Sequence, residues 1–185
     1  MAEPSDSKLV EGLARGDTRA FDSLYARLRA PLYAFLVRLS GQTDLAQDLL
    51  QETWLRLARS AAQLPLDTEL RPWLFTVARN LYRSHRRWVL LDGKRLQQLG
   101  WLPSAALPSP FDGAAANATE RAVEAALLRL SLEHREVLLL CSVSGFEPAQ
   151  AAAILGISDV AARQRLARAR AKLRESLEPC EEPSP

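Results

Sequence analysis

Hydrophobic residues recur at spacings of three and four along most of the chain, with polar residues between them, which is typical of amphipathic helices. The pattern predicts four helices in the first half of the chain, over residues 7–15, 19–40, 44–60 and 71–87. It predicts four more in the second half, over residues 119–130, 133–144, 148–155 and 159–177. No segment alternates between hydrophobic and polar residues as a half-buried strand would, so we expect an all-α fold.

Glycine and proline separate or interrupt these predicted helices. Gly16, Gly41 and Pro65 fall between helices, and Pro31 should kink or divide the second helix because proline cannot donate the helical hydrogen bond. Between residues 92 and 117, prolines lie among Ser, Ala and Gly with no sustained amphipathic period. The sequence therefore predicts two small helical domains, residues 7–91 and 118–178, joined by a flexible linker over residues 92–117.

The last two predicted helices are joined by a three-residue turn, which indicates a helix-turn-helix. Pro148 suits the first position of a helix, Gly156 provides a break, and the Ser158 hydroxyl can cap the helix that follows. The second helix carries six basic side chains, Arg163, Arg165, Arg168, Arg170, Lys172 and Arg174. A separate apolar stripe follows helical spacing, with Ala162, Leu166, Ala169, Leu173 and Leu177. We expect this stripe to pack inward while the basic residues face an anion such as DNA.

Composition narrows the classes of protein that need considering. A chain of 185 residues that is 48% hydrophobic and 25% charged can form one ordinary domain or two small ones. Because the net charge is only +2, the basic residues matter through their clustering. Cys141 lies in an apolar run that indicates a core position, and neither it nor Cys180 has ligand spacing with His85 or His134. We therefore expect no metal and no cofactor. The sequence also has no membrane-spanning run and no secretory signal, which predicts no membrane insertion and a cytoplasmic protein.

The helix predicted over residues 44–60 has two distinct faces. Its inward face contains Ala46, Leu49, Leu50, Thr53, Trp54 and Leu57. Asp44 is expected to cap the start of this helix, with Gln47 reaching back to the cap. The opposite face contains Asp48, Gln51, Glu52, Leu55, Arg56 and Arg59. For an isolated helix this second face is explained most simply as solvated surface, although Leu55 is an unexpectedly apolar member.

The helix predicted over residues 71–87 interleaves aromatic and basic side chains up to Trp88. The aromatic residues are Trp73, Phe75, Tyr82 and Trp88, and the basic residues are Arg71, Arg79, Arg83, Arg86 and Arg87. Aromatic rings among guanidinium groups suit stacking on unpaired bases and neutralisation of phosphates. Trp73, Val77 and Leu81, which are spaced four apart, are explained more simply as core positions.

Taken together, three segments resemble regions 2 and 4 of the extracytoplasmic-function (ECF) group of bacterial sigma factors. These segments are DLAQDLLQETWLRLAR, RPWLFTVARNLYRSHRR and LSLEHREVLLLCSVSGFEPAQAAAILGISDVAARQRLARARAKLRE. Their order and spacing match the family, and the resemblance covers nearly everything between Leu9 and Leu177. The helix-turn-helix alone could belong to many regulators, whereas the two upstream segments are highly specific. Larger sigma factors carry an additional promoter-reading domain between these regions, and the short predicted linker agrees with its lack here.

The resemblance implies roles for the upstream segments. It implies that the first segment docks on a coiled coil of the largest polymerase subunit, through Asp48, Gln51, Glu52 and Leu55, which gives the exposed leucine a purpose. It implies that the loop over residues 61–70 captures a base flipped out of the minus-10 promoter element. In the next segment the Asn80 amide would pair with such a base while Arg79, Arg83 and Arg86 hold phosphates. Relatives often carry Phe, Arg and Gly in the loop where this chain has Leu64, Pro65 and Leu66.

The resemblance also implies that the helix-turn-helix recognises the minus-35 element. Gln164 and Arg168 would contact bases, with Arg163 and Ala167 flanking them. Phosphates would be contacted by Arg165, Arg170, Lys172 and Arg174. Ala161 and Ala162 stand where the family usually has Thr and Val, so we expect lower minus-35 affinity than in relatives. The implied partners are core RNA polymerase, promoter DNA and an anti-sigma factor that covers both domains.

Two other classes of protein are alternatives to this interpretation. A stand-alone helix-turn-helix regulator, with an N-terminal bundle that dimerises or senses a ligand, would need the face with Asp48 and Leu55 to be a self-interface. It would leave the helix containing Arg79 and Asn80 unexplained. An enzyme is less favoured, because the sequence has no Gly-rich phosphate loop, no nucleophile–base pair and no metal set. The sequence therefore predicts a sigma factor that performs no chemistry of its own.

Overall fold

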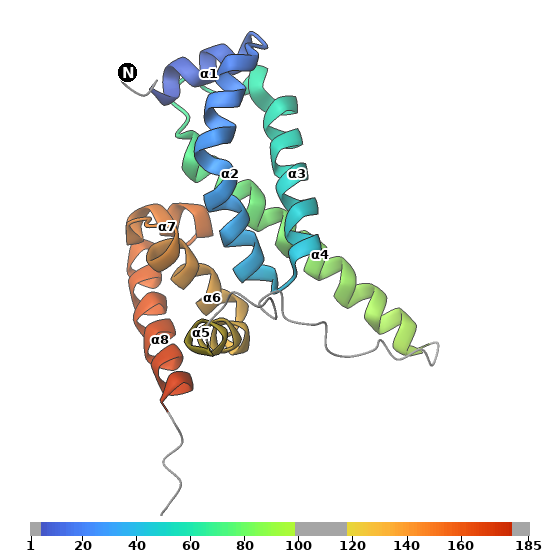
Figure 1. Cartoon of the computed structure of the whole chain (residues 1–185), viewed down its shortest axis with the longest axis vertical. Helices are drawn as coiled ribbons and strands as arrows, with labels where there is room; N and C mark the ends of the chain where they lie inside the picture. Colours follow the sequence, from blue (N-terminus) through green and yellow to red (C-terminus); the bar gives the residue numbers. More distant parts are fainter. Residues whose placement is uncertain (1–4, 99–117, 179–185) are drawn as a thin grey trace, which may run out of the picture. The chain divides into compact units, whose positions relative to one another are not determined.

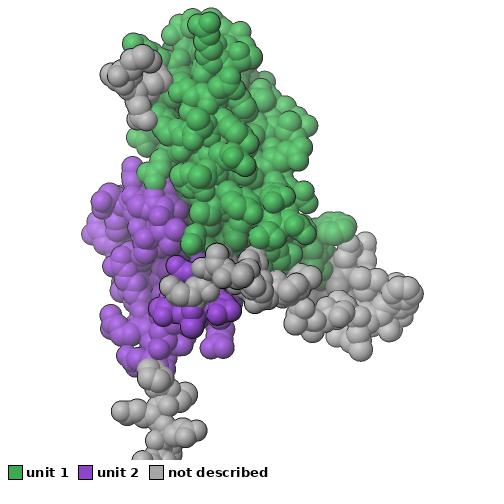
Figure 2. Space-filling model, viewed as in Figure 1, with its two compact units in different colours: residues 1–107 green, residues 108–185 purple. Residues whose placement is uncertain are grey.

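The computed structural model describes residues 5–98 and 118–178. The chain divides into two compact units, Met1–Leu107 and Pro108–Pro185, which Figure 2 shows in different colours. Every regular element within the described residues is a helix (Figure 1), which confirms the predicted all-α class. No helix in this part of the chain is both long enough and apolar enough to cross a membrane.

The first unit is a bundle of four α-helices. Its elements are α1 (Asp6–Ala14), α2 (Thr18–Ser40), α3 (Thr43–Ser60), the short 3-10 helix η1 (Ala61–Gln63) and α4 (Leu70–Gln98). Helix α2 packs against α1, α3 and α4, and α3 also packs against α4. Phe35 of α2 and Phe75 of α4 meet in the core, with ring centroids 5.2 Å apart, and both side chains are fully buried. This apolar core fixes which sides of α3 and α4 remain available to partners.

A carboxylate at the start of α1 joins three helices of this unit. One oxygen of Asp6 accepts a hydrogen bond from the Arg27 guanidinium of α2 at 2.9 Å. The other accepts from the backbone N–H of Leu70, the first residue of α4, also at 2.9 Å. The first N–H groups of a helix have no partner within the helix, so Asp6 satisfies one of them from a distant part of the sequence. It thereby fixes where α4 begins.

Three local features of this unit differ from the sequence prediction. Helix α2 runs unbroken through Pro31, so proline does not divide it. Helix α3 begins at Thr43 after Gln42, which places Asp44 in the first turn rather than at the cap. A carboxylate there still interacts favourably with the helix dipole. Helix α4 continues to Gln98, beyond the predicted helix end at residue 87 and into the first part of the predicted linker. The rest of that linker, residues 99–117, lies outside the described residues.

The second unit contains the predicted helix-turn-helix. Its elements are α5 (Ala118–Arg129), α6 (Leu132–Leu138), a π-helical turn η2 (Leu139–Val143), α7 (Pro148–Leu155) and α8 (Asp159–Leu177). Helix α8 packs against α5, α6 and α7. Arg135 of α6 donates to the backbone carbonyls of Leu127 at 3.0 Å and Leu130 at 3.1 Å, and so binds the end of α5. The helix predicted over residues 133–144 is thus α6 followed by a π turn.

The turn between α7 and α8 forms as the sequence predicts. Gly156 ends α7 in the left-handed conformation, with φ of 67°, which glycine adopts without steric cost. The Ser158 hydroxyl accepts from the Ala161 N–H at 3.2 Å and caps α8. Pro148 begins α7 after Glu147, whose N–H donates to the Gln150 side chain at 3.1 Å. Local hydrogen bonds therefore fix the orientation of α8 within its unit.

Candidate protein and nucleic-acid interfaces

The two faces of α3 lie as the sequence predicts. All six residues of the predicted inward stripe, from Ala46 to Leu57, are buried. On the opposite face Asp48 and Gln51 are exposed, Glu52 is half-buried, and Leu55 is 41% exposed. Glu52 accepts from the Arg56 guanidinium at 3.1 Å. This face therefore presents one apolar side chain among acidic, basic and amide side chains.

An aromatic groove borders Leu55. The Trp54 ring lies 5.6 Å from that of Phe21 and 4.9 Å from that of Tyr25, measured between centroids. The groove has a volume of about 230 Å³ and is lined by Phe21, Tyr25, Leu50, Gln51, Trp54, Leu55 and Ala58. Two of these aromatic residues belong to α2, and periodicity within α3 carries no information about them. The α3 face is thus continuous with an apolar recess.

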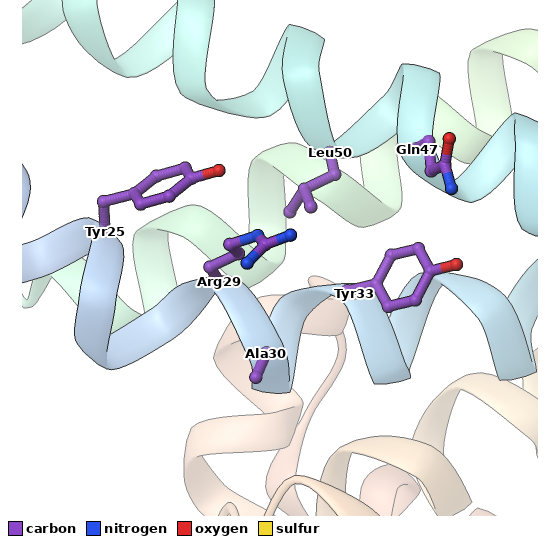
Figure 3. Close-up of a pocket in the computed structure, with 6 residues that line it drawn as sticks. All are labelled: Tyr25, Arg29, Ala30, Tyr33, Gln47 and Leu50. Carbon is purple, nitrogen blue, oxygen red and sulfur yellow. The ribbon is translucent and has the colours of Figure 1, made fainter.

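A second, larger groove lies between α2 and α3 (Figure 3). Its volume is about 560 Å³, and it is lined by Tyr25, Arg29, Ala30, Tyr33, Gln47 and Leu50. The Arg29 guanidinium carbon is 5.9 Å from the centroid of the Tyr25 ring, a distance suited to a cation–π contact. Tyr25 and Leu50 line both grooves. Together the two grooves extend the candidate protein interface from α3 onto α2.

Helix α4 presents Asn80 at its surface, but one of the predicted phosphate ligands is buried. Asn80 is exposed, and Arg83 and Arg86 are half-buried. Arg79 is only 6% exposed, and its guanidinium lies 3.4 Å from the Asn80 side-chain oxygen. A buried guanidinium cannot reach a DNA phosphate without leaving its position, so the predicted phosphate contact by Arg79 does not fit this structure. The arginine instead lies beside the amide that is expected to pair with a base.

The apolar stripe of α4 also lies one residue away from the prediction. Trp73, Val77 and Leu81 were the expected core positions, but all three are half-buried. The buried residues at the same spacing are Leu74, Ala78 and Tyr82. This rotation accompanies the packing of α4 against both α2, where Phe75 meets Phe35, and α3.

The minus-10 contacts that the resemblance implies leave out Arg87, which is a neighbour of Asn80 on α4. Arg87 is exposed and follows Asn80 by seven residues, which is about two turns, so the two lie on one side of α4. Arg86 lines a different recess together with Tyr82, His85 and Val89. Spacing along the helix could have identified Arg87 from the sequence. Trp88, next to it, is 63% exposed.

The basic helix α8 packs through the start of its predicted stripe. Ala162, Leu166 and Ala169 are buried, Leu173 is half-buried, and Leu177 is 40% exposed. The exposed residues include most of the predicted DNA contacts, Arg163, Gln164, Ala167, Arg168, Arg170 and Arg174. The stripe therefore leaves the opposite side of the helix open along its whole length.

Some basic residues of this unit already have partners within the protein. Arg163 forms an ion pair with Asp159 one turn earlier in α8. Arg165 is half-buried and lies 3.4 Å from a carboxylate oxygen of Glu133 in α6. Arg170 donates to the Ser142 hydroxyl at 3.5 Å.

Cys141, expected in the core, is half-buried, and burial raises the pKa of its thiol.

Comparison with known proteins identifies the family. Residues 24–88 match the family model of sigma-70 region 2, and residues 120–173 match that of sigma-70 region 4. The RNA polymerase sigma factor CarQ of Myxococcus xanthus is 35% identical over 171 residues, which cover 91% of this chain and 95% of CarQ. The ECF RNA polymerase sigma factor SigM of Mycobacterium tuberculosis is 33% identical over 175 residues, which cover 92% of this chain and 84% of SigM. The chain belongs to the ECF sigma factors.

A solved relative of this ECF sigma factor has the same fold. The sigma factor RpoE from Bartonella quintana, in complex with the anti-sigma factor NepR, superposes with a TM-score of 0.71 and 29% sequence identity. The match covers 86% of this chain and 98% of RpoE. The region 2 match includes all of α3 and most of α2, together with the part of α4 that carries Asn80. A stand-alone helix-turn-helix regulator would not account for this upstream match, so the chain functions as an RNA polymerase sigma factor.

Proposed function

We propose that this sigma factor docks on core RNA polymerase through the outward face of α3, with Asp48, Gln51, Glu52 and Leu55 as the contacts. The observation that carries the proposal is the exposed Leu55 beside the aromatic groove, surrounded by polar side chains. Protein interfaces commonly place an apolar anchor at the centre of a polar rim. The polymerase would cover the leucine and meet the surrounding carboxylates and amides with complementary groups.

The exposed side of α4 contacts the minus-10 element. Asn80 pairs with an extruded base, while Arg83 and Arg86 hold the backbone of the DNA near it. The exposure of Arg87 supports adding it to this set, in place of a direct phosphate contact by Arg79. Arg79 instead orients the Asn80 side chain by donating a hydrogen bond to its amide oxygen. The loop over residues 61–70, where Leu66 is 59% exposed, contributes a base preference of its own.

Helix α8 enters the major groove of the minus-35 element. Gln164 and Arg168 contact base edges, with Arg163 and Ala167 at the margins of the contact. Arg165, Arg170 and Arg174 hold phosphates and so set the register of the helix on the duplex. In this role Arg165 exchanges the Glu133 carboxylate for a DNA phosphate.

Regulation by an anti-sigma factor is the fourth part of the proposal. RpoE, which shares the fold, was solved bound to the anti-sigma factor NepR. A partner of this kind would compete with the polymerase for the docking face of α3 and act in the cytoplasm, where transcription takes place. The protein itself then supplies recognition and no chemical step.

Co-purification with core RNA polymerase tests the docking proposal. Changing Glu52→Arg together with Leu55→Asp should reduce retention of the sigma factor by roughly 100-fold or more, because it removes the anchor and reverses a charge. Neither side chain belongs to the inward stripe, so helical content and thermal unfolding should stay close to those of the wild type.

Glu11→Arg is the matched control for this experiment. Glu11 of α1 pairs with Arg15, the residue that follows this helix, as Glu52 pairs with Arg56 on α3, so the control reverses an equivalent charge elsewhere. It should co-purify normally. Equal retention of the double variant and the control would refute the α3 assignment.

A further inference from the structure

His134 lies at the start of α6, and a serine fixes its ring. Ser131, the N-cap residue of α6, places its hydroxyl oxygen 2.9 Å from Nδ1 of His134. The hydroxyl makes no side-chain cap bond to the helix backbone. With Nδ1 held in this way, Nε2 remains as the second polar atom of the ring. The imidazole is half-buried, and the helix that carries it packs against α8.

The surroundings of this ring are strongly basic. Burial lowers the pKa of His134, and the charges of Lys172, Arg165 and Arg168 lower it further, while Glu133 acts in the opposite direction. Glu133 is at the same time the ion-pair partner of Arg165. Burial and the three neighbouring cations therefore both favour the neutral form of the ring in the free protein. A polyanion that neutralises these cations would instead favour the charged form of the His134 ring.

We propose that His134 is a further phosphate-contacting residue of the minus-35 interface, and that binding of minus-35 DNA takes up one proton at its ring. The proposal rests on the proposed role of α8, in which Arg165 holds a phosphate and Arg168 contacts a base edge on this side of the unit. The proton comes from the solvent. The imidazolium formed donates through Nε2 to a phosphate oxygen while the Ser131 hydroxyl accepts from Nδ1.

Proton uptake makes the affinity depend on pH in a defined direction. The pKa of His134 is below its ordinary value in the free protein and rises in the complex, so the complex binds more protons between these two values. In that window affinity falls as pH rises, by at most about tenfold per pH unit for one proton. Above both values and below both values it is constant. We expect a loss of roughly tenfold between about pH 5.5 and about pH 8.

The chain makes this effect easy to assign because it contains only two histidines. The probe is a duplex selected by the full-length sigma factor from a random pool and containing no minus-10 element, with a scrambled duplex for comparison. Its affinity is measured by fluorescence anisotropy across this pH range at constant ionic strength. His134→Gln should match the wild type at the upper pH and show little change below it. His85→Gln, which changes the histidine of the first unit, should keep the full pH dependence.

Two further measurements separate a DNA contact from a structural role. His134→Arg should bind with pH-independent affinity and a steeper salt dependence, by about one phosphate contact. The imidazole proton resonances of His134, followed by NMR, should titrate at a higher pH with the duplex than without it. Circular dichroism at each pH confirms that the variants are folded.

The possible outcomes also distinguish this inference from the proposed function. If the sigma factor prefers the selected duplex but its affinity does not change with pH, the inference is wrong and the role of α8 stands. The same holds if His134→Gln keeps the wild-type pH dependence, or if the NMR titration is unaffected by DNA. If no duplex is preferred over its scrambled form at any pH, the proposed role of α8 itself fails.

Discussion

Removing the Asp6 carboxylate should destabilise the first unit, although this residue contacts neither polymerase nor DNA in the proposed function. Asp6→Ala leaves the Leu70 N–H at the start of α4 without its acceptor and breaks the ion pair with Arg27. Loss of a helix cap costs about 1 kcal/mol. Both partners of the ion pair are about a third exposed, with side-chain exposures of 29% and 32%, so solvent screening limits its contribution to less than about 1 kcal/mol. The expected loss of unfolding free energy is about 1 to 2 kcal/mol.

Tryptophan fluorescence can follow this loss in the first unit alone. All four tryptophans precede residue 108, so the signal reports the unit that contains α4. For a domain of this size the loss corresponds to a decrease in Tm of roughly 5 to 10 °C. Asp6→Asn, which retains an acceptor oxygen but no charge, should give a smaller decrease.

Glu11→Ala is the control, because it removes an exposed ion pair between α1 and Arg15, the residue that follows it, and should cost less than about 0.5 kcal/mol. If Asp6→Ala unfolded at the same temperature as Glu11→Ala, Asp6 would be an ordinary surface carboxylate and the capping argument would be refuted.

Two substitutions test the DNA contacts. Arg168→Ala should relax base preference at the minus-35 element. Arg174→Ala should weaken binding to all sequences alike and reduce the salt dependence of the affinity by about one phosphate contact. Equal losses of affinity for Arg168→Ala on selected and scrambled duplexes would contradict base contact. Asn80→Ala should leave closed-complex formation largely intact and reduce open complexes, measured by permanganate reactivity of unpaired thymines. Premelted templates should partly restore the activity of this variant, because they remove an unpairing cost of a few kcal/mol. Permanganate reactivity equal to that of the wild type would exclude base pairing by Asn80.

Helical periodicity predicted the features that depend on one helix or one turn. The inward face of α3, from Ala46 to Leu57, and the Gly156–Ser158 turn were both correct, because local spacing and local hydrogen bonds determine them. Helix α4 was harder, since two neighbouring stripes, one with Val77 and one with Ala78, fit the same spacing of four residues. Packing of α4 against α2 and α3, which includes the contact between Phe75 and Phe35, decides which stripe is buried.

Contacts between distant parts of the sequence could not be predicted from periodicity. Asp6 and Leu70 are 64 residues apart, and no pattern within either segment indicates their hydrogen bond. The aromatic groove likewise depends on Phe21 and Tyr25 of α2 meeting Trp54 of α3. The resemblance to a family indicated Leu55 as a contact, but the recess beside it follows only from the packing of the two helices.

The ion pairs of the second unit determine how much of its charge is available to DNA. Counting residues suggests six equivalent cations on α8, yet Arg163 and Arg165 already neutralise Asp159 and Glu133. For these two arginines, DNA binding exchanges one anion for another and adds little net attraction. Within the described residues Arg168 and Arg174 form no ion pair, so their attraction to phosphate is not offset in this way. A base-contacting arginine that is not committed to a carboxylate can turn toward guanine without breaking an internal contact, which favours Arg168 over Arg163 as the principal source of minus-35 specificity.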